Sequence, residues 1–242
     1  MRYFIFFICL SLTYIVVGQD SLATKEEVTR HSFLRVSIAP TSYRGDLVEN
    51  YRNPSAATTI GWYTTSNKRF DYELLLTGGR VQGSNANYTF LDENGILQRP
   101  NTFFSSTFYS FNFSLRTNWI KKENFKVYSA FGLGLLRFNP RDENDNQLED
   151  LLVTRAENES FNPTTLITPL ELGLTYFLSD RIGFGYSARW LNPSSDYIDN
   201  ISEWSINDRN DNILSHNFSL FWKLRSKTKE TKVALSNEKS EI

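Results

Sequence analysis

Sulfur is almost missing from this sequence of 242 residues, in which Cys9 is the one cysteine and Met1 the one methionine. Both lie at the very start, so the rest of the chain can form neither a disulfide framework nor a cysteine-ligated metal site, and it holds no catalytic thiol. An excess of charge is missing too, because 26 Lys and Arg residues face 27 Asp and Glu residues. This balance excludes a strongly basic nucleic-acid-binding protein, and no nucleic-acid partner is expected. The mean hydropathy of −0.40 excludes a polytopic helical membrane protein, although transmembrane β-barrels have such values as well.

The first segment has the pattern of an export signal. Met1 and Arg2 give a short positive start, residues 3–17 are almost entirely apolar, and a polar stretch begins after Gly18. The apolar run is shorter than the roughly 20 residues that a membrane-spanning helix prefers. We therefore predict a secretory signal peptide over residues 1–19, followed by a periplasmic lead over residues 20–31.

Apolar and polar residues then alternate in eight separate stretches. A period of two is typical of strands with unlike faces, and no amphipathic helix is evident. The predicted strands cover residues 32–39, 56–64, 70–81, 103–116, 126–138, 168–178, 182–191 and 213–224. Their connections are alternately long and short, and the four long ones hold 16 acidic but only 6 basic residues.

An even number of antiparallel strands with short turns at one end and long loops at the other is the anatomy of an outer-membrane barrel. A soluble eight-stranded barrel such as a lipocalin shares the strand period. Two features favour the membrane: the apolar face carries aromatics toward the strand ends, and the other face mixes charges with small residues. We predict an all-β, up-and-down transmembrane barrel over residues 32–225 in the bacterial outer membrane, and a disordered periplasmic tail over residues 226–242.

Charged residues on the polar face point into the predicted lumen. A barrel of eight strands is just wide enough for side chains to fill it, and buried charges need partners. We expect an interlocked salt-bridge network, with a gated conduit or proton path as the alternative. Its expected members are Arg35, Asp71, Glu73, Arg116, Glu171, Arg189 and Lys223. Arg80 and Arg137 have the opposite parity and lie near the long loops, where they could contact lipopolysaccharide phosphates.

The sequence gives little support for a catalytic or metal-binding site. Residues 142–146 resemble a calcium loop, but the glycine and the final glutamate of such loops are missing, so a solvated charged loop is the better interpretation. Ser215 and His216 lie together at a strand start, as a nucleophile and base would, but no acid partner is evident and His31 is at the other end of the barrel. We expect no enzyme, no cofactor and no metal.

Four short stretches carry a family resemblance. They are Thr41-Ser-Tyr43-Arg-Gly45-Asp46-Leu47, Phe138-Asn-Pro140, the proline-led strand from Pro169 to Tyr176, and Asp196-Tyr197-Ile-Asp199-Asn200. Together they resemble a family of small, OmpA-like outer-membrane barrels of the Bacteroidota type, which includes the barrel component of the type IX secretion machinery. The matching motif residues in the loops are Tyr43, Gly45, Asp46, Asp196, Tyr197 and Asp199.

The resemblance implies a non-enzymatic scaffold or anchor that links a periplasmic secretion assembly to the outer membrane. Outer-membrane lipid and periplasmic ring proteins would then be its partners. The charges available for that periplasmic contact would be Lys121, Lys122, Lys227 and Lys229. Two alternatives stay open: a general structural or surface-binding barrel that works through its acidic loops, and an enzyme that modifies lipid A.

Overall fold

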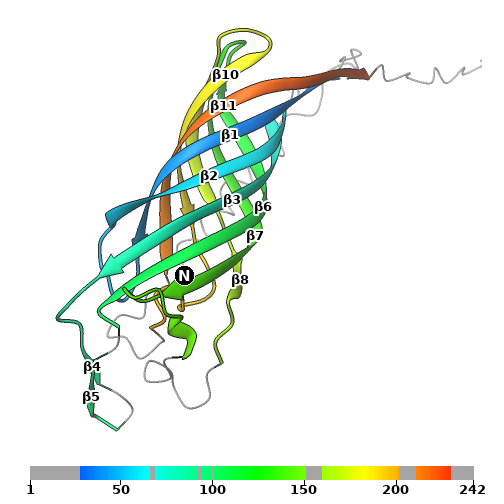
Figure 1. The fold of residues 1–242 in the computed structure, drawn as a ribbon. Helices are drawn as coiled ribbons and strands as arrows, with labels where there is room; N and C mark the ends of the chain where they lie inside the picture. The colour runs from blue at the N-terminus through cyan, green and yellow to red at the C-terminus, as the bar shows by residue number, and fades with distance from the viewer. Residues whose placement is uncertain are drawn as a thin grey trace, which may run out of the picture. The chain divides into compact units, whose positions relative to one another are not determined.

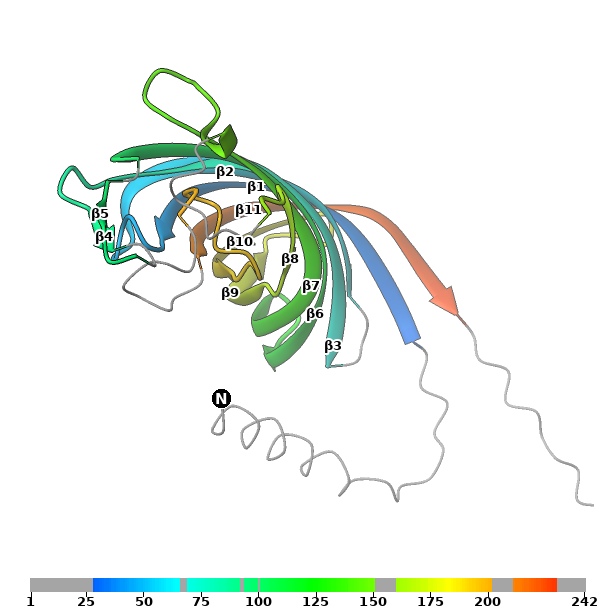
Figure 2. The same ribbon diagram turned by 90° about the horizontal axis from the view of Figure 1, so that it is seen from below.

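The chain forms a closed ring of antiparallel strands. The computed structural model describes residues 28–65, 69–91, 94–99, 101–150, 160–201 and 211–229. The long strands are β1 (Val28–Arg44), β2 (Arg52–Thr65), β3 (Phe70–Ser84), β6 (Phe103–Lys121), β7 (Phe125–Arg141), β9 (Leu170–Phe177), β10 (Ile182–Leu191) and β11 (Asn212–Lys229). They follow one another around the sheet, with β1 beside β11, and the pairing of β6 with β7 closes the ring. Figure 2 shows the strands curving around a common axis.

The predicted eight-stranded antiparallel barrel is confirmed. The sixth predicted strand, residues 168–178, corresponds to β9. The short strand β8 (Thr164–Ile167) precedes the predicted range and pairs with the same neighbour, β7. Gly134 faces Ile167 and Phe131 faces Leu170, so β8 and β9 share one register along β7. Pro169 lies between them and has no N–H to donate to a ladder, but its carbonyl still accepts from the backbone N–H of Gly132 at 3.0 Å.

The structure differs from the prediction mainly at the ends of strands and in the long loops. β1 begins at Val28, inside the predicted lead, and β11 continues to Lys229, inside the predicted tail. The long loops add a hairpin of β4 (Phe90–Leu91) and β5 (Leu97–Gln98), visible at the lower end of Figure 1, and a 3-10 turn at Leu148–Asp150. Elements of two or three residues are too short to show a period. The predicted signal peptide and the end of the tail lie outside the described residues.

Among the described residues, no helix is long and apolar enough to cross a membrane.

The outer face of the ring is apolar on every strand. Large exposed side chains include Ile38 on β1, Leu76 on β3, Leu133 on β7 and Leu220 on β11. A soluble monomer rarely exposes apolar patches beyond a few hundred Å², whereas a lipid-facing belt requires them. Aromatic residues gather on this face near the short turns, as in the girdles of membrane barrels; they are Trp62, Phe70, Tyr72, Trp119, Tyr176 and Trp222. The chain is therefore a transmembrane barrel.

Side chains fill the lumen in successive layers. At the long-loop end the loops fold inward and form an apolar cluster that includes Tyr43, Leu47, Phe104, Phe138 and Ile198. Buried charged residues occupy the middle of the lumen. Toward the short turns comes a small aromatic layer made of Phe33, Tyr63, Phe177 and Phe221. Beyond this layer the lumen widens into an open cavity.

Candidate functional site in the barrel lumen

Five buried charged side chains meet in the middle of the lumen. Nη1 of Arg35 lies 2.9 Å from Oε1 of Glu73, and its Nη2 lies 3.1 Å from Oε1 of Glu171. Nε of Arg189 donates to Oε2 of Glu171 at 2.6 Å. Arg116 also pairs with Glu73, and its Nη2 lies 3.8 Å from Oε1 of Glu171. We call this set the central network: three guanidinium groups around two carboxylates.

The sequence builds this network by placing one inward residue on each of several strands. The register sets Glu73 on β3 beside Ser114 on β6, and Glu171 on β9 beside both Ala130 on β7 and Arg189 on β10. Small inward residues leave room for the long ones. At Gly173 a Cβ atom would lie 2.6 Å from the hydroxyl of Tyr128, which explains why glycine stands there.

Aromatic residues hold the guanidinium groups as much as the carboxylates do. The hydroxyl of Tyr128 donates to Glu171 at 2.6 Å. The guanidinium of Arg116 lies 3.9 Å from the centre of the Tyr128 ring and 4.5 Å from that of Tyr63. Desolvated cation–π contacts of this kind contribute up to about 2 kcal/mol each. They offset the surplus of one positive charge in the central network.

Asp71 belongs to a second group, closer to the short turns. Its carboxylate accepts hydrogen bonds from Tyr63 at 2.7 Å and Asn118 at 2.9 Å, and it pairs with Lys126 at 3.2 Å and Lys121 at 3.6 Å. Lys126 was not among the expected lumen residues, although it has the same parity as Tyr128 and Ala130. All three donors of its ammonium group are used, by Asp71, Tyr63 and Thr65.

Lys223 does not join either group, contrary to the expectation for it. The aromatic layer, which includes its near neighbour Phe221, separates it from the central network. Within the part of the chain that the structure describes, Lys223 forms no ion pair. It lies instead in the wall of a cavity of about 520 Å³ at the short-turn end.

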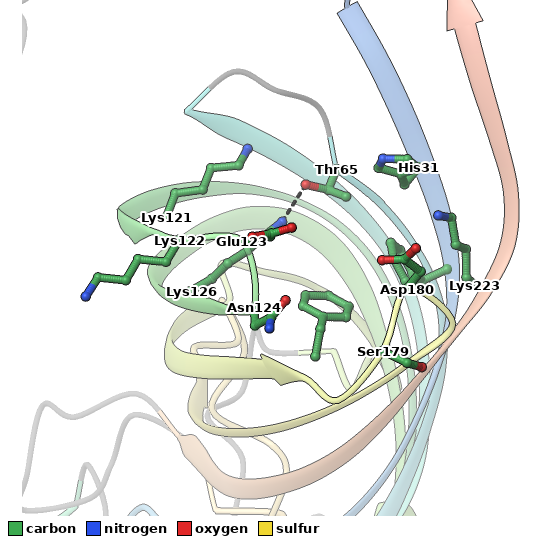
Figure 3. Close-up of a pocket in the computed structure, with 12 residues that line it drawn as sticks. His31, Thr65, Lys121, Lys122, Glu123, Asn124, Lys126, Ser179, Asp180 and Lys223 are labelled. Atoms are coloured by element: carbon green, nitrogen blue, oxygen red, sulfur yellow. Dashed lines mark hydrogen bonds between the residues drawn. The ribbon is translucent and has the colours of Figure 1, made fainter.

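This cavity, which we call the vestibule, is lined by residues of six strands and two turns (Figure 3). Lys121, Lys126 and Thr65 lie on one side of it, and His31 and Lys223 lie on the other. Phe33 and Phe177 of the aromatic layer line it as well. The turn residues Lys122, Glu123, Asn124, Ser179 and Asp180 form its rim. Because short turns face the periplasm in outer-membrane barrels, the vestibule opens on that side.

The loop motifs of the family resemblance meet at the opposite end. Oδ2 of Asp199 accepts from the backbone N–H of Leu47 at 3.0 Å, and its Oδ1 accepts from that of Ile201 at 3.0 Å. Tyr43 donates to Asp211, which also accepts from the backbone N–H of Ile198 at 2.7 Å. We call this arrangement the loop clamp. Asp211 was missed from the sequence, where nothing ties it to either motif.

Burial decides the protonation of the two clamp carboxylates. It raises the pKa of Asp199 from 3.8 to about 6, against the lowering effect of the two backbone donors. It raises the pKa of Asp211 well above its ordinary value, and the charges of Asp199 and Asp196 raise it further. Burial and these two neighbouring charges therefore favour the protonated form of Asp211.

The other motif residues have simpler places. Gly45 begins a turn in which its N–H donates to the carbonyl of Val48 at 3.0 Å. Asp46 is buried beside it. The ring of Tyr197 packs edge-on against Phe161 at 5.9 Å, next to the apolar cluster.

The sequence candidates for catalysis and metal binding do not form sites. Ser215 is buried and points inward, whereas Nδ1 of His216 bonds the hydroxyl of Tyr186 at 2.8 Å on the outer face. The carboxylate of Asp142 accepts from the backbone of Asn144 and Asn146, as in a self-contained polar turn. No cluster that could hold a metal ion occurs among the described residues.

Arg80 and Arg137 are exposed on the outer face near the long loops. They lie on either side of β6, where Arg80 faces Thr107 and Arg137 faces Tyr109. Of the residues named for the periplasmic contact, Lys121 and Lys122 line the vestibule. The side chains of Lys227 and Lys229 lie outside the described part of the chain.

A closed barrel with a lipid-facing belt, with all its backbone groups paired between strands, is the form that outer-membrane proteins take. The protein is an outer-membrane β-barrel.

Comparison with known proteins adds solved structures of the same kind. Neisserial surface protein A matches with a TM-score of 0.49 and 12% identity, over 80% of this chain and 97% of that chain. Ail of Yersinia pestis, solved with a heparin analogue, matches with a TM-score of 0.47 and 9% identity, over 81% and 99%. The outer-membrane protein AlkL matches with a TM-score of 0.30 and 10% identity, over 90% and 97%. No protein-family model and no curated protein matches the sequence.

Proposed function

We propose that this protein is a non-enzymatic scaffold that anchors a periplasmic assembly to the outer membrane through its short-turn end. The observation that carries the proposal is the filling of the lumen. Arg35 and Glu73 have no exposed surface at all, and they lie between the apolar cluster on one side and the aromatic layer on the other. A barrel filled in this way is built to hold its shape and to present its ends, not to conduct solutes.

The kind of assembly follows from the loop motifs. Their resemblance to the barrel component of type IX secretion suggests a periplasmic ring of that machinery as the partner. The vestibule supports a periplasmic contact because it is a concave surface with uncompensated charge on the expected side. The alternative of a surface receptor would use the acidic long loops instead.

Three measurements test the scaffold. Purified protein in a planar bilayer should give no step conductance, and a well-defined open state would contradict a filled lumen. A strain without the gene should fail to export type IX substrates, and the protein should recover periplasmic ring components when it is extracted in mild detergent. Normal export in that strain would refute the secretion role and leave a general structural or surface-binding barrel.

A further inference from the structure

We infer that the vestibule is a binding site for an acidic peptide segment of a periplasmic partner, which would place carboxylates between Lys121 and Lys223. This inference rests on the scaffold function and names the chemistry of its contact.

The cavity has the size and shape of a ligand site. Its volume of about 520 Å³ lies within the range of about 300–1,000 Å³ that is usual for ligand pockets. It is closed on the inner side, because Phe33 and Phe177 form part of the packed aromatic layer. A ligand can therefore enter from the periplasm and stop there.

Positive charge exceeds negative charge inside the vestibule. Four lysines line the cavity, and two of them, Lys121 and Lys126, pair with the carboxylate of Asp71. Lys223 stands across the cavity from them and has no ion-pair partner in the described ranges (Figure 3). The acidic residues of the rim, Glu123 and Asp180, are exposed, where solvent screens their charges strongly.

Hydrogen-bonding capacity is also left over. Nδ1 of His31 is buried without a hydrogen-bond partner among the described residues. A buried polar atom of this kind usually has a partner, and His31 lies beside Lys223 in the cavity wall. A peptide could supply both a carboxylate for the lysine and a polar group for the imidazole.

The lining favours a peptide over a small inorganic anion. Phe33 and Phe177 give the inner wall an aromatic surface, against which the methylene groups of Glu side chains or neighbouring apolar residues can pack. The buried Lys126 uses all three of its N–H donors within the protein. It therefore contributes positive electrostatic potential to the cavity but no direct contact with a ligand. Phosphate alone would find two cations on opposite walls and no cradle of backbone donors.

The test uses the full-length protein folded in detergent and a fluorescent decapeptide of alternating Glu and Ser, with its amide counterpart of Gln and Ser as the matched probe. Fluorescence anisotropy should show binding of the acidic peptide alone, weakened by added salt. The combined change Lys121→Gln and Lys223→Gln should weaken binding about tenfold, the weight of one or two partly buried charge pairs. The control Arg181→Gln removes one positive charge, half the change of the double variant, from a turn at the same end that lies outside the cavity lining; it should leave binding within about twofold.

Several results would overturn the inference. Equal binding of the two peptides would show that carboxylates are not recognised. Equal weakening by Arg181→Gln would show that only the general charge of this end matters. Binding that occurs only after residues 230–242 are removed would assign the vestibule to the chain's own tail, and inorganic phosphate that competes as well as the peptide would assign it to a small anion.

The outcome is separable from that of the scaffold function. If the lysine variant loses the peptide but still recovers the periplasmic ring, the scaffold stands and the contact lies elsewhere. If the peptide binds as expected but export is normal without the gene, the site stands and the secretion role fails.

Discussion

Glu171→Gln should be among the most destabilising single changes in the lumen. Glu171 accepts from Arg35, Arg189 and Tyr128 at 2.6–3.1 Å. The amide has one acceptor oxygen in place of two and carries no charge. The change therefore leaves three buried guanidinium groups with Glu73 as their only carboxylate in the central network. Removing one partner of a buried ion pair costs about 3–5 kcal/mol, and we expect a loss in that range.

The measurement is urea unfolding of the protein folded in short-chain lipid vesicles, followed by tryptophan fluorescence. Thr59→Val is the matched control, because it removes a buried lumen hydrogen bond, that from Thr59 to Thr77 at 2.9 Å, without changing charge or size. It should cost only about 1 kcal/mol. A loss for Glu171→Gln no greater than that of this control would refute the electrostatic account of the network.

A double variant separates charge from packing. Among the described residues, Arg189 forms an ion pair with one carboxylate, that of Glu171. Arg189→Met should therefore relieve part of the defect of Glu171→Gln, because it removes one of the unpaired cations. In a double-mutant cycle the two changes should be less than additive by about 1–3 kcal/mol. Strict additivity would mean that the two side chains do not interact as the structure describes.

The remaining predictions concern the long-loop end. Gly45→Ala should destabilise the loop clamp by about 1–3 kcal/mol, because a Cβ atom there would lie 2.1 Å from Oδ1 of Asp211; faster proteolysis of the loops would report it. Because the pKa of Asp199 is raised to about 6 in the folded state, its contribution to stability is complete below pH 4 and is lost as pH rises through 6. Amide exchange at residues 198–201 should accelerate over that window in the native protein and stay flat in Asp199→Asn. Changing Arg80 and Arg137 to Gln should lower stability by about 1 kcal/mol in lipopolysaccharide-containing bilayers and not in uncharged detergent, since only the former offers phosphates.

Much of the barrel could be predicted because the alternation of side chains between the two faces of a strand is visible in the sequence. Side chains alternate between two environments, lipid and lumen, and both leave a clear mark on the sequence: apolar residues such as Leu133 and Leu135 alternate with glycines such as Gly132 and Gly134 on β7. The same alternation indicated that Arg35, Glu73 and Glu171 point inward. Parity says which face a residue occupies, however, and not how high in the barrel it stands.

That missing coordinate explains the errors within the lumen. Lys223 and Arg35 share the inward face, but the register and the aromatic layer put them in different compartments. Asp71 likewise meets Lys126, not the arginines, because its height matches the beginning of β7. The position of a residue along the barrel axis depends on the register stagger between neighbouring strands. This stagger is fixed only when all the strand pairs close into a ring.

The loop clamp shows a second limit, that of distance along the chain. Tyr43 and Asp211 are 168 residues apart, and the loops that bring them together have no period. The motif residues could be picked out by resemblance, but their mutual contact could not. The contacts explain why these residues occur in the motifs. Gly45 has no side chain and so leaves space for the hydroxyl of Tyr43. Asp199 accepts hydrogen bonds from the backbone of both loops.

The two ends of the barrel differ in the ionisable groups that they bury. Carboxyl groups dominate the loop clamp, where Asp46, Asp199 and Asp211 are buried together, and ammonium groups dominate the vestibule. The central network and the two hydrophobic layers stand between them and exclude water. Because Asp199 lies in the loop clamp, a rise in pH from 5 to 7 should loosen that end of the barrel. Acidic-peptide binding should then be unaffected by Asp199→Asn, and a pH dependence of binding that this variant abolishes would show that the two ends are coupled through the lumen.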